Sequence, residues 1–174
     1  MSVQQSNSGW RLWGKASGAT ALSLAICALV ATPSSASSNQ VLGHFYDTGT
    51  VTPSEKIVCA SGGTAIHGSA TFKAKPGDRW HGTTSYDYCL YPESTPGSYS
   101  YSGTETLTGT VDGCGKGSFT YFGKGETASG GTWKIIRGSG TGRLTHASGS
   151  GTDTATTDPT TLENWGVFQG QFTC

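Results

Sequence analysis

The stretch from residue 98 to residue 111 alternates between two kinds of side chain. Every even position holds serine or threonine, whereas the odd positions hold tyrosine, glycine, leucine, valine and one glutamate. Residues two apart lie on the same face of a β-strand. The pattern therefore predicts a strand with one hydroxyl face and one apolar face. Glu105 falls on the apolar face, where a carboxyl group is unusual.

The same period of two recurs along the chain, between segments whose glycine, proline and aspartate residues favour reversals. Residues 153–163 are rich in threonine and aspartate and are predicted to form a long surface loop. No segment has the periodicity of a helix. We expect eight strands, at residues 41–51, 65–74, 79–91, 98–111, 117–122, 131–137, 142–148 and 165–174.

Most of these strands have one apolar and one polar face. Antiparallel strands of this kind must curl or stack to bury the apolar face. We therefore predict an all-β fold, an antiparallel up-and-down β-barrel of about eight strands, with a two-sheet β-sandwich as the alternative. The alternation places His67 and His81 on the solvent side, and His146 is expected at the surface or rim.

The N-terminal residues have the features of a signal peptide. Arg11 and Lys15 precede a thirteen-residue apolar run at residues 19–31, and small residues follow at 34–36. The run is shorter than the roughly 20 residues that a membrane-spanning helix needs. We predict a signal peptide at residues 1–36, a single domain at residues 37–174, and a secreted protein, extracellular or associated with the cell wall, without a membrane anchor after cleavage.

The composition of the mature chain gives no sign of a nucleic-acid partner, a metal or a cofactor. Removal of the leader takes two of the 11 basic residues, so nine face 11 acidic residues and the formal charge is 9 − 11 = −2. This balance does not favour nucleic acid as a partner. The four histidines lack the spacing of metal ligands, and neither a metal nor a cofactor is predicted.

The four cysteines of the mature chain are Cys59, Cys89, Cys114 and Cys174. In an exported protein they suggest two disulfides, for which three pairings exist. If the strands alternate in direction, Cys59 and Cys89 lie at one end of the barrel and the other two at the opposite end. The topology therefore predicts the pairs Cys59–Cys89 and Cys114–Cys174.

Three segments in the second half of the chain resemble a known family. Residues 131–137 (GTWKIIR), 138–144 (GSGTGRL) and 149–152 (GSGT) are similar to the W…GSGTG.L…GSG pattern of bacterial β-barrels related to allene oxide cyclase. Residues 101–105 and 117–119 fit the preceding strands, so the resemblance covers about residues 77–152. It implies a small β-barrel; many such barrels have no known activity, and the plant namesakes cyclise an unsaturated fatty-acid epoxide inside the barrel.

The resemblance carries the fold and not the chemistry. The plant enzymes are thought to use an acidic residue, a proline and asparagines from early strands, and residues 44–50 hold Asp47 but neither glutamate nor asparagine. Glu105 is therefore a candidate only because of its place in the alternation. A carboxyl group buried in an aromatic pocket could act as a general acid or base, or bind the polar end of a ligand. It could also pair with Arg137 or a tyrosine hydroxyl and simply fill the barrel.

We predict that the barrel binds an apolar or aromatic small molecule. One alternative is an isomerase of the cyclase type that uses Glu105 as acid and base, and another is a secreted inhibitor or interaction protein acting through loops 92–97 and 153–163. The predicted ligand-binding residues are Tyr86, Tyr99, Tyr101, Glu105, Tyr121 and Trp133.

Overall fold

The computed structural model describes residues 40–48, 50–73, 75–158, 160–161 and 163–174. These residues belong to one compact unit. The predicted signal peptide at residues 1–36 lies outside the described residues. Among the described residues no helix is long and apolar enough to span a bilayer.

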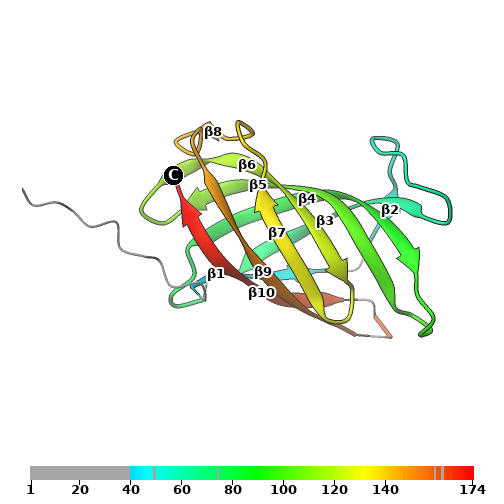
Figure 1. Ribbon diagram of the computed structural model, residues 1–174. Coiled ribbons are helices and arrows are strands. Elements are labelled where there is room, and N and C mark those ends of the chain that lie inside the picture. The colour runs from blue at the N-terminus through cyan, green and yellow to red at the C-terminus, as the bar shows by residue number, and fades with distance from the viewer. Residues whose placement is uncertain (1–39, 49, 74, 159, 162) are drawn as a thin grey trace, which may run out of the picture. The chain divides into compact units, whose positions relative to one another are not determined.

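Eight antiparallel strands close into a barrel, which confirms the predicted fold and excludes the sandwich (Figure 1). Neighbouring strands follow one another along the chain, and β1 closes the barrel by pairing with both β3 and β10. Two short outer strands, β2 (Thr52–Pro53) and β8 (Thr141–Gly142), pair with β3 and β6. The barrel strands are β1 (Val41–Asp47), β3 (Thr64–Lys73), β4 (Trp80–Pro92), β5 (Tyr99–Val111), β6 (Gly115–Glu126), β7 (Gly130–Ile135), β9 (Ser148–Thr157) and β10 (Asn164–Thr173).

The alternation along β5 sorts its side chains as predicted. Glu105, Leu107 and Val111 are buried, whereas Thr108 and Thr110 are exposed. Glu105 is paired with Tyr86 on β4 and with Tyr121 on β6, and both of these tyrosines are also buried. The odd positions of β5 therefore face the interior of the barrel, and its serine and threonine residues form the outer wall.

One end of the barrel is filled by aromatic side chains. Trp80 is fully buried, and the ring centroids of Phe119 and Trp133 lie 5.2 and 5.3 Å from its own. Phe168 and Phe172 follow at 5.6 and 5.7 Å. The contacts with Phe119, Trp133 and Phe172 are edge-to-face and the contact with Phe168 is tilted. Edge-to-face contacts are favourable for aromatic rings, and all of these rings bury a large apolar area. This end is a packed core in which the side chains leave little space.

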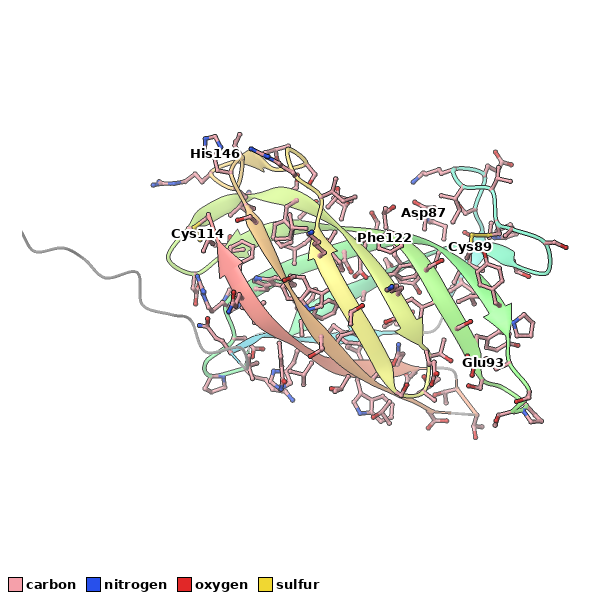
Figure 2. All side chains as sticks on the ribbon, viewed as in Figure 1. Asp87, Cys89, Glu93, Cys114, Phe122 and His146 are labelled. Atoms are coloured by element: carbon pink, nitrogen blue, oxygen red, sulfur yellow. A yellow bond between two sulfur atoms is a disulfide. The ribbon has the colours of Figure 1, made fainter. Side chains whose placement is uncertain are left out.

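The two disulfides have the predicted pairing, Cys59–Cys89 and Cys114–Cys174, with Cα–Cα distances of 5.5 and 5.9 Å. They lie at opposite ends of the barrel (Figure 2), because Cys89 is near the end of β4 and Cys114 follows β5, which runs the other way. Disulfides are typical of oxidising compartments. Their presence fits an extracellular location.

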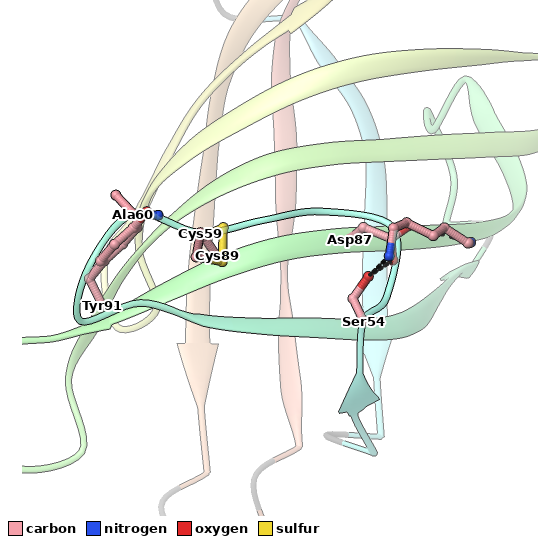
Figure 3. The surroundings of a disulfide bond; sticks show 7 residues. Ser54, Cys59, Ala60, Asp87, Cys89 and Tyr91 are labelled. Carbon is pink, nitrogen blue, oxygen red and sulfur yellow. Dashed lines mark hydrogen bonds and ion pairs between the residues drawn. A yellow bond between two sulfur atoms is a disulfide. The ribbon is translucent and has the colours of Figure 1, made fainter.

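The first disulfide holds a loop against the outer wall of β4 (Figure 3). Two further contacts support it: the Ser54 hydroxyl donates to Asp87 at 2.6 Å, and the Ala60 amide donates to the Tyr91 hydroxyl at 3.3 Å. The segment between β2 and β3 is therefore fixed to the barrel at several points.

Two predicted elements near the C-terminus are wrong. Of the predicted strand 142–148 only the two end residues are extended, Gly142 in β8 and Ser148 at the start of β9. The residues between them form turns, in which Leu144 and Ala147 are buried. The predicted loop 153–163 instead begins inside β9, which runs to Thr157. The inward positions of β9 hold only glycine, aspartate, alanine and threonine, so the strand has no hydrophobic periodicity. The predicted loop 153–163, one of the two loops considered for an interaction protein, is therefore shorter than expected, because residues 153–157 belong to β9.

Candidate functional site

A cavity of about 250 Å³ occupies the part of the barrel that the Trp80 cluster does not fill. Its deep wall includes Phe45, Tyr121, Trp133 and Phe168. Its entrance is formed by residues at the end of the barrel near Cys89, on the side of Figure 2 opposite to Cys114 and His146. Among these are Val51, Leu90, Tyr99, Thr127 and Thr157. The volume is slightly below the range of drug-sized pockets, about 300–1,000 Å³, and suits one small molecule.

All six residues predicted to bind a ligand line this cavity: Tyr86, Tyr99, Tyr101, Glu105, Tyr121 and Trp133. Tyr99 is the most exposed of them and Tyr121 is fully buried. Their role in ligand binding stays a prediction.

Three tyrosine hydroxyls in the cavity wall donate hydrogen bonds to three carboxyl groups. Tyr86 donates to Asp47 at 2.5 Å, and Tyr88 donates to Glu105 at 2.7 Å. Tyr101 donates to Asp153 at 3.0 Å. All six side chains line the cavity, so each carboxyl group is held in place by a neutral donor.

Sequence reasoning missed three of these residues. Asp47 shares a face with Phe45 on β1, and this parity was a usable signal. Tyr88 shares the apolar face of β4 with Tyr86 and was equally accessible to the same argument. Asp153 was hidden because its strand was read as a loop.

The three tyrosines form a row across β4 and β5. The rings of Tyr86 and Tyr88 are stacked with centroids 5.0 Å apart, and the rings of Tyr88 and Tyr101 are 5.2 Å apart. Tyr86 can lie flat on the wall because Gly68 on β3 has no side chain: a Cβ there would stand 2.2 Å from the Tyr86 hydroxyl oxygen. A glycine is therefore needed at position 68 for close approach.

Burial dominates the electrostatics of the cavity. It raises the pKa of Glu105, which is 6% exposed, and the hydrogen bond from Tyr88 opposes this rise only in part. The charge of Asp153 acts in the same direction as burial. Burial also raises the pKa of Asp153 itself, against the hydrogen bond from Tyr101. Both carboxyl groups therefore keep a proton to higher pH than ordinary acids do.

The tyrosines stay protonated throughout. Burial, with Asp47 and Glu105 nearby, raises the pKa of Tyr86 and Tyr88 well above the usual range for tyrosine. Burial and Asp153 do the same for Tyr101. The three hydroxyls are consequently hydrogen-bond donors at any physiological pH.

The predicted pairing of Glu105 with Arg137 is wrong, because Arg137 is exposed on the surface. The alternative partner of Glu105, a tyrosine hydroxyl, is present as Tyr88. None of the described side chains that line the cavity is a lysine, arginine or histidine. Glu105 and Asp153 therefore have neutral tyrosine donors as partners and no described cationic side chain beside them in the cavity wall.

Two polar atoms in the wall lack a hydrogen-bond partner among the described residues. These are the hydroxyl oxygen of Tyr121 and Oδ1 of Asn164. The Tyr121 hydroxyl is near enough to Glu105 to influence its carboxyl group, but the geometry falls short of a hydrogen bond. More than nine in ten buried polar groups are paired in native proteins, so both atoms are suited to contact a bound molecule.

The histidines lie elsewhere. His67 contacts Asp87 at 3.0 Å and His81 contacts Asp112 at 3.3 Å, both on the outer face as the alternation predicts, and His146 is exposed. In the part of the chain that the structure describes, no group of three or more His, Cys, Asp or Glu side chains is arranged to hold a metal ion.

The comparisons with known proteins point to a family without an assigned function. A crystal structure of a protein with unknown function from the DUF3224 family of Shewanella oneidensis MR-1 is similar to the chain, with 19% sequence identity and a TM-score of 0.48. The similarity covers 76% of this chain and 95% of that one. No curated protein matches the chain. The family model described as "Protein of unknown function (DUF3224)" matches residues 50–163, and the chain therefore belongs to the DUF3224 family.

Proposed function

We propose that this protein is secreted and binds a small apolar or aromatic molecule inside its barrel. The observation that carries the proposal is the cavity of about 250 Å³, which is lined mainly by aromatic and aliphatic side chains. Secretion is supported by the leader-like sequence at residues 1–36 and by the two disulfides.

The contrast between the two ends of the barrel supports binding. At one end Trp80, Phe119 and Phe172 pack against each other in the interior. At the other end the wall residues include Ala70, Gly123 and Ala155, whose small side chains leave space in front of them. Interiors of proteins are normally packed as densely as organic crystals. A space kept by small residues beside large aromatic ones is typical of a ligand pocket.

The expected affinity follows from the buried area. An aromatic ring buries about 150–250 Å². At about 25 cal/mol per Å² this corresponds to about 4–6 kcal/mol, or a Kd between roughly 1 mM and 40 μM, before any hydrogen bond is counted. A weak aromatic probe is therefore sufficient to test the cavity.

The test is a calorimetric titration with indole, a neutral aromatic molecule. Ala155 lines the cavity, and its replacement in Ala155→Phe fills the space. Thr156 is the next residue on β9 and is exposed on the outer face, so Thr156→Phe is the matched control. We expect binding by the wild type and by Thr156→Phe, and loss of binding by Ala155→Phe. Indole that binds Ala155→Phe as well as the wild type, or no binding at millimolar concentrations by folded protein, would disprove the proposal.

Glu105 supports a second candidate function, an isomerase of the cyclase type. It is a buried carboxyl group that lines the cavity and is fixed by Tyr88, as a general acid or base requires. The resemblance to barrels related to allene oxide cyclase suggests an unsaturated fatty-acid epoxide as the substrate to try. Ring formation that is lost in Glu105→Gln would favour this function, and the same rate in the variant would exclude Glu105 as the acid or base.

A further inference from the structure

The polar groups of the cavity wall are unbalanced in charge. Glu105 on β5 and Asp153 on β9 both line it, and none of the described lining side chains is cationic. We propose that the ligand of this cavity is a small aromatic amine with one positive charge, whose ammonium group binds between Glu105 and Asp153. This inference rests on the proposed function, since it specifies the ligand of the same site.

The charge argument starts from the partners of the carboxyl groups. Tyr88 and Tyr101 donate hydrogen bonds to Glu105 and Asp153 but bring no charge, so an ionised carboxylate at either position is solvated by its tyrosine without being neutralised by it. Taking a charge out of water is costly unless an opposite charge accompanies it. Glu105 and Asp153 line the same cavity, so two ionised carboxylates there would also repel each other. An ammonium group between them removes both penalties together.

The aromatic part of the wall suits the same ligand. Tyr86, Tyr88 and Tyr101 line the cavity beside the carboxyl groups with which they pair. A cation near the face of an aromatic ring is attracted by the ring quadrupole, and cages of aromatic residues are a known way to bind ammonium groups. The deeper rings of Trp133 and Phe168 provide an apolar surface for the ring of the ligand.

The second line of evidence is the unpaired Tyr121 hydroxyl. Tyr121 is fully buried and lines the cavity, and its hydroxyl oxygen has no hydrogen-bond partner among the described residues. Oδ1 of Asn164, another unpaired atom of the same wall, can accept a hydrogen bond from an ammonium group. Buried polar groups in native proteins are nearly always paired. These two atoms therefore indicate a polar molecule in the cavity and not a hydrocarbon.

An inorganic cation fits the site less well. The carboxyl groups come from three different strands, and the described residues contain no arrangement of three acidic or histidine side chains around one point. A volume of about 250 Å³ also far exceeds what one metal ion occupies. An organic cation fills this space and can contact both the carboxyl groups and the rings of Trp133 and Phe168.

The experiment compares three probes that share a phenyl ring on a short chain and differ in charge. These are 2-phenylethylamine (cationic), 2-phenylethanol (neutral) and 3-phenylpropanoate (anionic), titrated calorimetrically into the wild-type protein at neutral pH. Because charge-assisted hydrogen bonds are about twice as strong as neutral ones, we expect the amine to bind at least about tenfold more tightly than the alcohol. The carboxylate should bind most weakly.

Variants then test whether Glu105 and Asp153 cause the preference for the amine over the alcohol. Glu105→Gln and Asp153→Asn should each reduce the ratio of amine to alcohol affinity by several-fold. Asp112 is an exposed aspartate at the closed end of the barrel, so Asp112→Asn is the control with the same loss of charge. Circular dichroism confirms that each variant is folded.

The outcomes separate this inference from the proposed function. Equal affinity for the amine and the alcohol, or binding of indole without binding of the amine, overturns the amine and leaves a neutral binding site. A preference for the amine that survives both Glu105→Gln and Asp153→Asn also overturns it, because the cation then binds elsewhere. If neither indole nor any of the three probes binds, the proposed function fails, and the inference fails with it.

Discussion

Replacement of Glu105 by glutamine is expected to change how the stability of the protein depends on pH. Glu105 is 6% exposed, and burial raises the pKa of its carboxyl group in the folded state. In the unfolded chain the same group titrates near the ordinary value of about 4.3. The folded state therefore binds this proton more tightly than the unfolded state does.

The sign of the effect follows from this difference. The proton on Glu105 contributes stability that is fully present below about pH 4.3, and this contribution is lost as the pH rises through the raised pKa of the folded state. Glutamine does not titrate, yet it keeps an oxygen that can accept the hydrogen bond from Tyr88. The free energy of unfolding of Glu105→Gln should therefore increase relative to that of the wild type as the pH increases.

The magnitude is set by the size of the pKa shift. Each unit by which the folded pKa exceeds the unfolded one corresponds to about 1.4 kcal/mol. The difference between variant and wild type should grow by this amount for each unit of pH across the interval between the two pKa values, and then stay constant. A plateau in the difference thus measures the folded pKa directly.

Urea unfolding from about pH 4 to about pH 9, followed by tryptophan fluorescence with both disulfides intact, gives the required free energies. Glu93 is an exposed glutamate on the turn after β4, and Glu93→Gln is the matched control. Its difference from the wild type should not reproduce this rise. If the difference between Glu105→Gln and the wild type is constant over the whole range, or decreases with pH, the carboxyl group is not desolvated and the reasoning is refuted.

Three further predictions concern the framework of the barrel. Trp80→Ala, which removes the fully buried centre of the aromatic cluster, should lower the free energy of unfolding by about 3–5 kcal/mol in urea titrations; a loss below 1 kcal/mol would show that this end is not tightly packed. The double variant Cys114→Ser/Cys174→Ser opens a loop of 60 residues in sequence separation and should cost about 4 kcal/mol, measured against the wild type under oxidising conditions; an unchanged melting temperature would contradict this value. Gly68→Ala places a Cβ 2.2 Å from the Tyr86 hydroxyl oxygen and should displace that ring, with a loss of about 1–3 kcal/mol and weaker binding of indole; an unchanged free energy of unfolding would show that the ring is not displaced.

The sequence was sufficient for the parts of the fold that alternation and chain direction control. The strict pattern around Glu105 predicted the inner face of β5, and the alternating direction of the strands was enough to select Cys114 as the partner of Cys174. Both inferences depend only on period and parity, which are properties of a single strand or of neighbouring strands.

The rest depends on contacts between strands that are far apart in sequence. The inward positions of β9 hold only small side chains, and one of them, Asp153, is contacted from β5 by Tyr101. In such a strand threonine alternates with other small residues and no large apolar side chain marks the inner face. The sequence pattern therefore predicts a loop there. The cavity was equally hidden, because Trp80 and Tyr88 share one face of β4, and only the assembled barrel shows which of them meets a crowded interior and which meets open space.

The packing around Trp80 also determines the route that a ligand can take. Since that end of the barrel is blocked by Phe119, Trp133, Phe168 and Phe172, a molecule cannot pass through and must leave by the way it came in. If the proposed ligand binds, it therefore enters and leaves through the strand ends near Cys59–Cys89. Reduction of this disulfide would release the neighbouring loop and is then expected to make the exchange of the ligand faster.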